Sequence, residues 1–313
     1  MELLRHSFTQ NWTTADITKQ TGTQAVVTGG SSGLGFETAL ALARAGADVI
    51  LAGRNGAAAH EALHTIRHLV PGVLVRFEKL DLARQQSVGD FASRLVARNH
   101  PIDLLVHCAG TMESAQRQVT ADGFEMQLAV HYLGPFALTA RLLPLLRQSR
   151  HPRVVQVSSL AHRQGTIDFD DLQLAREYEV RAAHCQSKLA SLMFALELQR
   201  RSDAHGWGLL SVAAHPGNPG VEWPAGRAVS TAQNERKQHA GPSQTVSAGA
   251  LAILFAATST LAKPGGYYGP TGSFELAGPP GPARIDEKAR DRNVSRRLWA
   301  TAEQLTGVRW PAD

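Results

Sequence analysis

The sequence predicts an α/β protein in which helices cover both faces of a mostly parallel sheet. Short β-branched runs alternate with longer helical segments, and a glycine-rich turn joins the first strand to the first helix. No linker rich in Pro, Gly or Ser divides the 313 residues near the middle. We therefore expect a single domain over residues 24–313, preceded by an arm over residues 1–23 that lies on its surface.

The strands are expected where short apolar runs end at Gly, Asp or other polar residues. These runs span residues 24–28, 48–52, 73–80, 103–107, 153–157 and 208–213, with a last candidate near 266–276. The helices are expected where Ala and Leu recur with helical spacing. They span residues 36–45, 60–69, 86–98, about 122–147, about 179–202 and 245–257. Strands and helices that alternate in this way predict a doubly wound sheet.

The segment 216–242 is rich in Gly, Pro and polar residues and is too long for a simple connection. It follows a late strand, at the edge where α/β sheets bind ligands. We expect it to cover a substrate, and Trp223 and Pro224 would supply apolar surface. A surface insertion without a role is the alternative interpretation.

The composition narrows the class of protein. Hydrophobic residues make up 43% and charged residues 19% of the chain, which is enough apolar surface for a packed core. The net charge is +5, but the arginines are scattered without a basic block, so we do not expect a nucleic-acid partner. Cys108 and Cys185 have no CxxC spacing, which favours a reducing compartment over a disulfide. With no recognisable signal peptide or membrane span, a cytoplasmic location is expected.

The glycine-rich turn predicts a dinucleotide site. Thr28–Gly35 reads TGGSSGLG, follows a strand and opens a helix, as in a Rossmann-type βαβ unit. Such a turn brings backbone N–H groups close to a pyrophosphate. After the second strand, Arg54 stands where a carboxylate would favour NAD, so we expect NADP(H) with Arg54 at the 2′-phosphate. Asp81, after the third strand, is placed to meet the adenine.

These motifs resemble the short-chain dehydrogenase/reductase family over almost the whole chain, in particular its retinol-dehydrogenase-like branch. The TGxxxGxG opening, Asp81-Leu82, and the VSSLAH segment over residues 157–162 all match, as does the Ser-Lys-Leu-Ala run over 187–190. The turn and the resemblance together imply that the cofactor is bound by Thr28, Gly29, Ser31, Ser32, Gly33, Leu34, Gly35, Arg54, Asp81, Leu82, Ala109, Gly110, Lys188, Pro216 and Gly217.

The resemblance implies an Asn-Ser-Tyr-Lys site, from which this chain departs. Ser159 and Lys188 stand at matching positions, but His184 replaces the tyrosine of YxxxK and His131 replaces the asparagine. A third histidine, His107, stands in the segment that usually reads NNAG. The threonine that commonly follows Pro216-Gly217 is also missing.

We expect imidazole to take over the proton of the tyrosine. Imidazole exchanges protons near neutral pH, although it reaches less far than a phenol, so the substrate must lie deeper or a water must bridge. The candidate catalytic residues are Ser159, His184, Lys188 and His131. The resulting hypothesis is an NADP(H)-dependent oxidoreductase acting on a carbonyl or alcohol of a small lipophilic molecule.

Two alternatives remain: a non-redox proton-transfer, elimination or cyclisation enzyme that uses His131 and His184, and a protein that only binds the cofactor. The histidines lack metal-ligand spacing, so no metal is expected. His60, His64 and His68 form an i, i+4, i+8 stripe that we expect to be solvated. Apolar residues at 189, 192, 193 and 196 indicate either core packing or, by resemblance, a homodimer interface.

Overall fold

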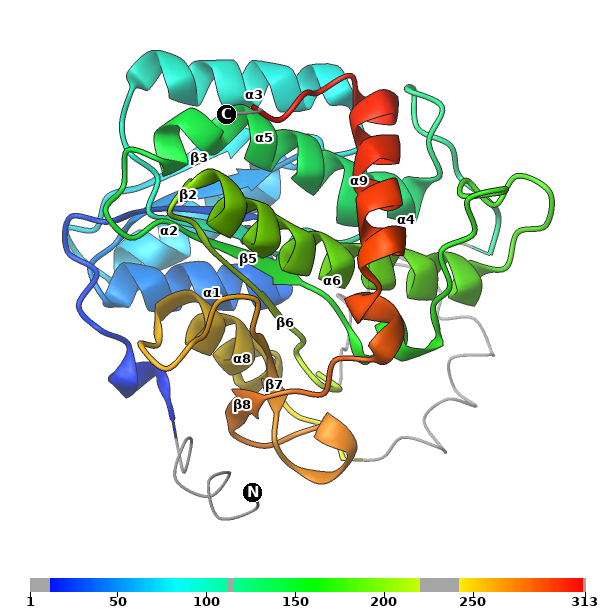
Figure 1. Ribbon diagram of the computed structural model, residues 1–313. Helices are drawn as coiled ribbons and strands as arrows, with labels where there is room; N and C mark the ends of the chain where they lie inside the picture. Colours follow the sequence, from blue (N-terminus) through cyan, green and yellow to red (C-terminus); the bar gives the residue numbers. More distant parts are fainter. Residues whose placement is uncertain (1–11, 112–114, 220–241, 312–313) are drawn as a thin grey trace.

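A central sheet carries the site, in a computed structural model that describes residues 12–111, 115–219 and 242–311. Its eight strands lie in the order β3-β2-β1-β4-β5-β6-β7-β8 (Figure 1). All neighbouring pairs are parallel except β7 and β8. The strands are β1 (Gln24–Thr28), β2 (Asp48–Gly53), β3 (Val75–Lys79), β4 (Leu104–His107), β5 (Arg153–Val157), β6 (Leu210–Ala214), β7 (Tyr267–Pro270) and β8 (Pro280–Pro282). The predicted doubly wound α/β class is therefore confirmed.

Helices cover both faces of the sheet, as Figure 1 shows. One apolar cluster joins the sheet to α1 (Gly33–Arg44), α2 (Gly56–Leu69) and α8 (Val246–Thr258). The other joins it to α3 (Gln85–Arg98), α5 (Gly134–Leu146), α6 (Val180–His205) and α9 (Arg292–Thr306). Strand order reverses between β1 and β4, and their carboxyl ends, Thr28 and His107, are register partners. This reversal is where doubly wound sheets bind ligands.

Short helical segments complete the chain. A short α4 (Met126–Leu128) and a π-helical turn, η2 (Ala129–Leu133), lead into α5. The 3₁₀ turns are η1 (Thr14–Asp16), η3 (Leu160–Gln164), η5 (Ser273–Glu275) and η6 (Glu287–Arg290). Of the expected arm, residues 12–23 are described, and Trp12 lies edge-on to Phe255 of α8 at 5.4 Å. Residues 1–11 lie outside the described part.

Several expected bounds were wrong. Helix α1 begins at Gly33 rather than residue 36, and α2 begins at Gly56 because the Asn55 side chain caps the N–H groups of Ala57 and Ala58. The strand expected near 266–276 ends at Pro270 and is followed by a 3₁₀ turn. Strand β8 and helix α9 were not expected at all. Strand β8 is rich in Pro and α9 is rich in Arg, so neither has a typical apolar pattern. The bounds of α9 are nevertheless marked, because the Asp291 side chain caps its start and Gly307, at φ +66°, ends it.

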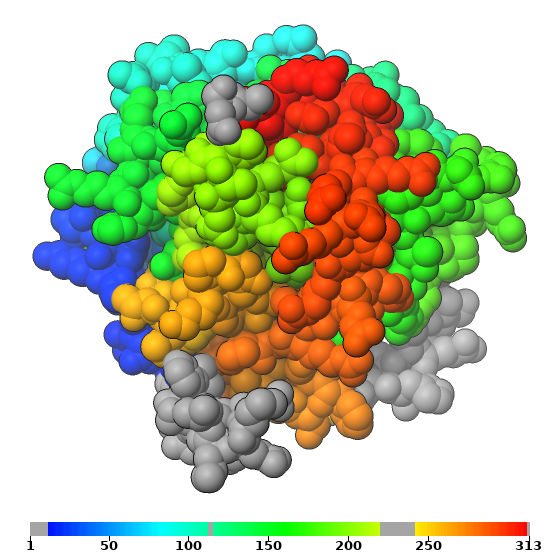
Figure 2. All heavy atoms as spheres, viewed as in Figure 1, coloured from blue at the N-terminus to red at the C-terminus, as the bar shows by residue number. Residues whose placement is uncertain are grey.

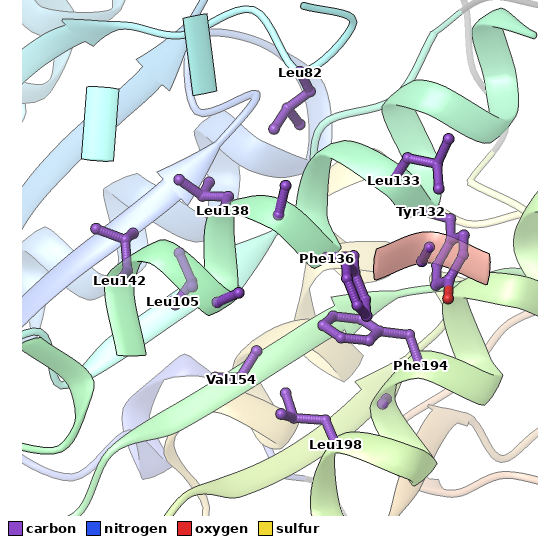
Figure 3. Close-up of a cluster of buried hydrophobic side chains, with 14 of the residues drawn as sticks. Leu82, Leu105, Tyr132, Leu133, Phe136, Leu138, Leu142, Val154, Phe194 and Leu198 are labelled. Carbon is purple, nitrogen blue, oxygen red and sulfur yellow. The ribbon is translucent and has the colours of Figure 1, made fainter. Parts of the chain in front are cut away.

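Helix α6 is enclosed by the chain itself. Every residue from Cys185 to Gln199 is buried, and the phenyl ring of Phe194 lies against Phe136 of α5 at 5.7 Å (Figure 3). Trp299 of α9 closes the same cluster, 4.9 Å from the Phe136 ring. The apolar pattern over 189–196 is thus explained by core packing within one chain.

One helical stretch among the described residues is long and apolar enough to cross a bilayer. It spans Met126–Leu146, and 89% of its apolar window is buried inside the protein. A core helix passes the same test, so length and composition are weak evidence for a span.

Candidate active site

The glycine turn is packed so tightly that only glycine fits. Gly29 has φ +67°, and a Cβ there would lie 2.8 Å from the Ala109 Cα. A Cβ on Gly35 would lie 2.2 Å from the Gly29 carbonyl oxygen. The hydroxyl of Thr28 accepts hydrogen bonds from the N–H groups of Cys108 and Ala109, each at 3.1 Å. The turn after β1 and the loop after β4 therefore form one backbone-lined cradle. It contains residues 28–35 and 109–110, for which cofactor binding stays a prediction.

The start of α1 offers its backbone donors to this cradle. Ser32 is the N-cap residue, yet its side chain makes no capping hydrogen bond. Within the described part of the chain, the first N–H groups of this helix therefore have no side-chain cap. Such a terminus is suited to an anionic group. Ser31, Gly33 and Leu34 complete the turn beside it.

Arg54 lies at the edge of the same turn. It directly follows β2 and is exposed, and a Cβ on the preceding Gly53 would lie 3.9 Å from the Ser31 hydroxyl oxygen. Its guanidinium makes no ion pair or hydrogen bond with any other described residue. The cation is therefore placed beside the turn without an internal partner.

Asp81 and Leu82 fix the end of β3 against α5. The Asp81 carboxylate accepts a hydrogen bond from the Ala83 N–H at 3.1 Å, and the Asp81 N–H donates to the Ser87 hydroxyl at 2.9 Å. Leu82 is buried, and its carbonyl oxygen would lie 2.5 Å from a Cβ on Gly134. The two residues thus lie at the expected carboxyl end of β3.

Ser159 and Lys188 are brought together by bonds between β5 and α6. The Ser158 hydroxyl donates to the Lys188 carbonyl at 2.8 Å, and the Lys188 ammonium donates to the Val157 carbonyl at 3.3 Å. Ser159 begins the η3 turn, where its hydroxyl accepts from the Ala161 N–H at 3.2 Å. Burial lowers the pKa of Lys188 to about 8, partly offset by nearby Cys108.

His131 is held by both ring nitrogens. The Thr111 N–H donates to Nε2 at 3.3 Å, so the neutral ring carries its hydrogen on Nδ1, which donates to the Ser187 hydroxyl at 2.9 Å. That hydroxyl in turn donates to the His184 carbonyl at 2.9 Å. Burial, with Lys188 and His184 nearby, holds the pKa of His131 well below its usual range. The ring is a neutral link between the β4 loop and α6.

His184 lies beside this link. Its ring is perpendicular to that of His131, with centroids 5.9 Å apart, and its Nδ1 lies 3.1 Å from Oε1 of Gln127. Burial, together with Lys188 and Arg181, lowers the pKa of His184 to about 4. The imidazole that replaces tyrosine is therefore neutral at pH 7.

His107 and the histidine stripe lie apart from this chemistry. His107 Nε2 donates to the Thr139 hydroxyl at 2.8 Å, and burial lowers its pKa to about 3. His60, His64 and His68 are exposed on α2 and, with Arg67, line a surface pocket. Within the described ranges, no three or more His, Cys, Asp or Glu residues are grouped as metal ligands.

The Pro216-Gly217 segment adjoins the cradle at Leu34, near the start of α1. A Cβ on Gly249 of α8 would lie 3.1 Å from Leu34 and 3.2 Å from Pro216, so the three residues meet. The Gly217 N–H donates to buried His215 at 3.2 Å, and His215 bonds to Glu275 at 3.1 Å. Of the expected covering segment, residues 220–241, with Trp223 and Pro224, lie outside the described part.

Sequence reasoning missed two residues that hold the histidines. Gln127 contacts the His184 ring, and Ser187 contacts the His131 ring. One signal was available: Gln127 and His131 are polar residues four apart in an otherwise apolar helical stretch, so they share a face. What that face meets depends on contacts across more than fifty residues.

A family model for short chain dehydrogenases matches residues 23–218. The chain belongs to the short-chain dehydrogenase family. Retinol dehydrogenase 13 of Mus musculus is 36% identical over 298 residues, covering 92% of this chain and 84% of the relative. Polyprenol dehydrogenase of Mus musculus is 38% identical over 295 residues, covering 92% and 85%.

A solved structure agrees with this relation. A crystal structure of a protein from Mycobacterium paratuberculosis is 36% identical, with a TM-score of 0.80, covering 97% of this short-chain dehydrogenase and 100% of the other chain. The family and the branch expected from the motifs are thus confirmed. The family match and the similar dehydrogenases therefore place the chain in an oxidoreductase family.

Proposed function

We propose that the chain is an NADP(H)-dependent oxidoreductase that interconverts an alcohol and a carbonyl group on a small lipophilic molecule. The observation that carries the proposal is the bonding of β5 to α6 through Ser158 and Lys188. It brings Ser159 and Lys188 to the carboxyl edge of the sheet, beside the glycine cradle. His184 lies one helical turn before Lys188 on the same helix.

The cradle suits a nicotinamide dinucleotide. A pyrophosphate needs close backbone approach, which the absence of a Cβ at Gly29 and Gly35 permits. The uncapped start of α1 supplies N–H donors, and unpartnered Arg54 supplies a cation for a 2′-phosphate. When bound, the nicotinamide would accept or supply the hydride. Ala109, Gly110, Pro216 and Gly217 would line its course.

The polar residues divide the remaining work. Ser159 at the end of β5 would orient the substrate oxygen by a hydrogen bond. Neutral His184 would exchange a proton with that oxygen. Lys188 would hold the cofactor ribose. Burial and, after it, the nearby Lys188 ammonium lower the pKa of His184. His131, with both nitrogens bonded inside the protein, would position Ser187 and α6 rather than move a proton.

The substrate class rests on the relatives. Retinol and polyprenol, in the names of the similar proteins, are lipophilic alcohols. A lipophilic alcohol or its carbonyl product is therefore the substrate class proposed for this chain.

The alternatives differ in their readout. A non-redox enzyme would form product without a change in NADPH absorbance, and a cofactor-binding protein would form none. His131 supports the non-redox alternative poorly, because its ring nitrogens already bond to Thr111 and Ser187.

Two measurements test the proposal. Fluorescence titration should show NADPH binding, and failure to bind both NADPH and NADH would overturn the cofactor assignment. With retinol and NADP⁺ or retinal and NADPH, His184→Ala should lower turnover by about 100-fold or more. His151→Ala, a matched change at an exposed site, should leave turnover unchanged. Equal turnover of wild type and His184→Ala would exclude His184 as the proton-transfer group.

A further inference from the structure

We infer that Gln127 is a positioning residue that holds the His184 ring as its Nδ1–H tautomer, so that Nε2 accepts the proton of an alcohol substrate. The inference rests on the proposed function, because it assumes that His184 exchanges the proton. It adds a residue to the site and identifies Nε2 as the ring atom that exchanges the proton.

Gln127 is rigidly placed. It is 1% exposed, and its N–H donates to the Glu125 carboxylate at 2.9 Å, which caps the short α4. Its side-chain amide nitrogen donates to the carbonyl oxygen of Val180, the first residue of α6, at 3.4 Å. A carbonyl oxygen can only accept, so this contact identifies which end of the amide is nitrogen. The amide oxygen, Oε1, therefore faces His184.

The orientation of the amide determines the tautomer of the imidazole. Because Oε1 can only accept, the His184 Nδ1 atom at 3.1 Å must carry a hydrogen. A neutral imidazole has one N–H, so the lone pair is then on Nε2. The second nitrogen of a histidine is commonly fixed by such a partner in catalytic and metal sites.

The charges around His184 favour this neutral form. Burial and, after it, the cations Lys188 and Arg181 on its own helix lower the pKa of His184 to about 4. From η2, the ring of His131 faces it edge-on and is itself neutral. Among the described residues, these groups favour a neutral His184 ring in the resting enzyme.

Oxidation of an alcohol at this site balances in protons and electrons. The O–H bond of the alcohol breaks and its proton goes to Nε2 of His184. The C–O bond becomes a carbonyl, and a nicotinamide bound in the cradle would accept the C–H electron pair as hydride. The imidazolium next returns its proton to solvent, which its cationic neighbours favour. In the opposite direction the protonated ring would give the same proton to the carbonyl oxygen.

Nitrogen NMR tests the tautomer without cofactor or substrate. The chain has 13 histidines, so the signals of His184 are assigned by their loss in His184→Ala of ¹⁵N-histidine-labelled protein. We expect the Nδ1–H pattern in wild type and its loss or mixing in Gln127→Met, which keeps the side-chain volume but removes the acceptor. An Nε2–H pattern in wild type, or an unchanged pattern in Gln127→Met, would overturn the inference.

Kinetics gives a second readout. In Gln127→Glu a carboxylate would face the Nδ1–H group of His184 and raise the pKa of its ring. The acid limb of the pH profile of kcat/KM for alcohol oxidation should therefore move to higher pH by more than one unit. Gln148→Glu, the same charge change at an exposed position, should leave the profile in place. Thermal melting checks that each variant folds. In Gln127→Met, kcat should fall by about tenfold or more with little change in KM.

The two proposals fail differently. If His184→Ala remains active, the proposed role of His184 fails. If His184→Ala is inactive but the Gln127 variants keep the wild-type tautomer and pH profile, only the role of Gln127 fails. A pH profile that moves equally in Gln127→Glu and Gln148→Glu would also count against it.

Discussion

The Nδ1 atom of His131 lies 2.9 Å from the hydroxyl oxygen of Ser187, the residue before Lys188. Through this bond the π-helical turn η2 is joined to α6 one residue before Lys188. The other ring nitrogen bonds to the loop after β4 through Thr111. One buried ring therefore connects three segments that form the site.

We expect His131→Ala to lower the free energy of unfolding by about 2–4 kcal/mol, because it removes buried volume and leaves Thr111 N–H without its partner. Urea unfolding measures this. The exposed variant His151→Ala should differ from wild type by less than about 0.5 kcal/mol. A His131→Ala protein of wild-type stability without activity would instead indicate a direct role in proton transfer.

Acid should destabilise the protein through its buried histidines. The pKa of His107 is about 3 in the folded chain and about 6.5 when unfolded. Between about pH 3 and about pH 6.5 the unfolded chain binds a proton at His107 that the folded chain does not bind. The stability that the neutral, buried His107 contributes to the folded state is therefore fully present above about pH 6.5 and is lost as the pH falls. His107→Asn should lose about 1.4 kcal/mol less between pH 7.5 and 5.5 than wild type in urea unfolding. Identical pH dependence of the two proteins would contradict a neutral buried His107.

Arg54 should select the phosphorylated cofactor. In Arg54→Glu the dissociation constant for NADPH should rise by about 10- to 100-fold, because a charge-assisted contact to phosphate becomes a repulsion. The constant for NADH, which lacks the phosphate, should change by less than about threefold. Fluorescence titration of both cofactors checks this, with Arg147→Glu at another exposed arginine as the control. Equal loss of both cofactors in Arg54→Glu would argue against a 2′-phosphate contact.

Gly29 should tolerate no side chain. Gly29→Ala adds a Cβ 2.8 Å from the Ala109 Cα at a residue with φ +67°. We expect unfolding free energy to fall by about 2–3 kcal/mol and cofactor binding to be lost. Gly22→Ala has a similar strain, with φ +82°, but nothing lies within 4 Å of its Cβ. It should cost only about 1 kcal/mol and keep binding; equal effects of the two variants would rule out the close contact as the cause.

The chain should be a monomer. The face of α6 that could join a second copy is buried against α5 and α9. Figure 2 shows atoms of the α9 region packed directly beside those of the end of α6. The Arg201 guanidinium lies 4.3 Å over the Trp299 ring. Light scattering should give 33.7 kDa. A mass twice as large at micromolar concentration would show that another surface pairs.

Local patterns were enough for most of the sheet and for the cradle. The bounds of β1 and β5 agree with those expected, because apolar runs end at residues that cannot continue a strand. Helix α9 was missed because its apolar side chains are few and stand among arginines, although Asp291 and Gly307 mark both ends. The cofactor half of the site follows from one turn, which is local in sequence.

The catalytic half could be predicted only in part. The candidate catalytic residues at 131, 159, 184 and 188 were selected by their positions in family motifs, and such motifs do not predict the hydrogen bonds of these residues. That His131 is bonded through both nitrogens, and that Gln127 faces His184, follows from α4, η2 and α6 lying side by side. Such contacts depend on tertiary packing and have no local sequence pattern.

The position of α9 also bears on how the chain folds during synthesis. Trp299 and Leu298 complete the cluster around Phe136 and Phe194, yet they are translated about a hundred residues after α6. Until they leave the ribosome, nascent α5 and α6 expose an apolar surface to which chaperones can bind. Premature termination before residue 292 would therefore yield an aggregation-prone product even though every proposed catalytic residue had been made.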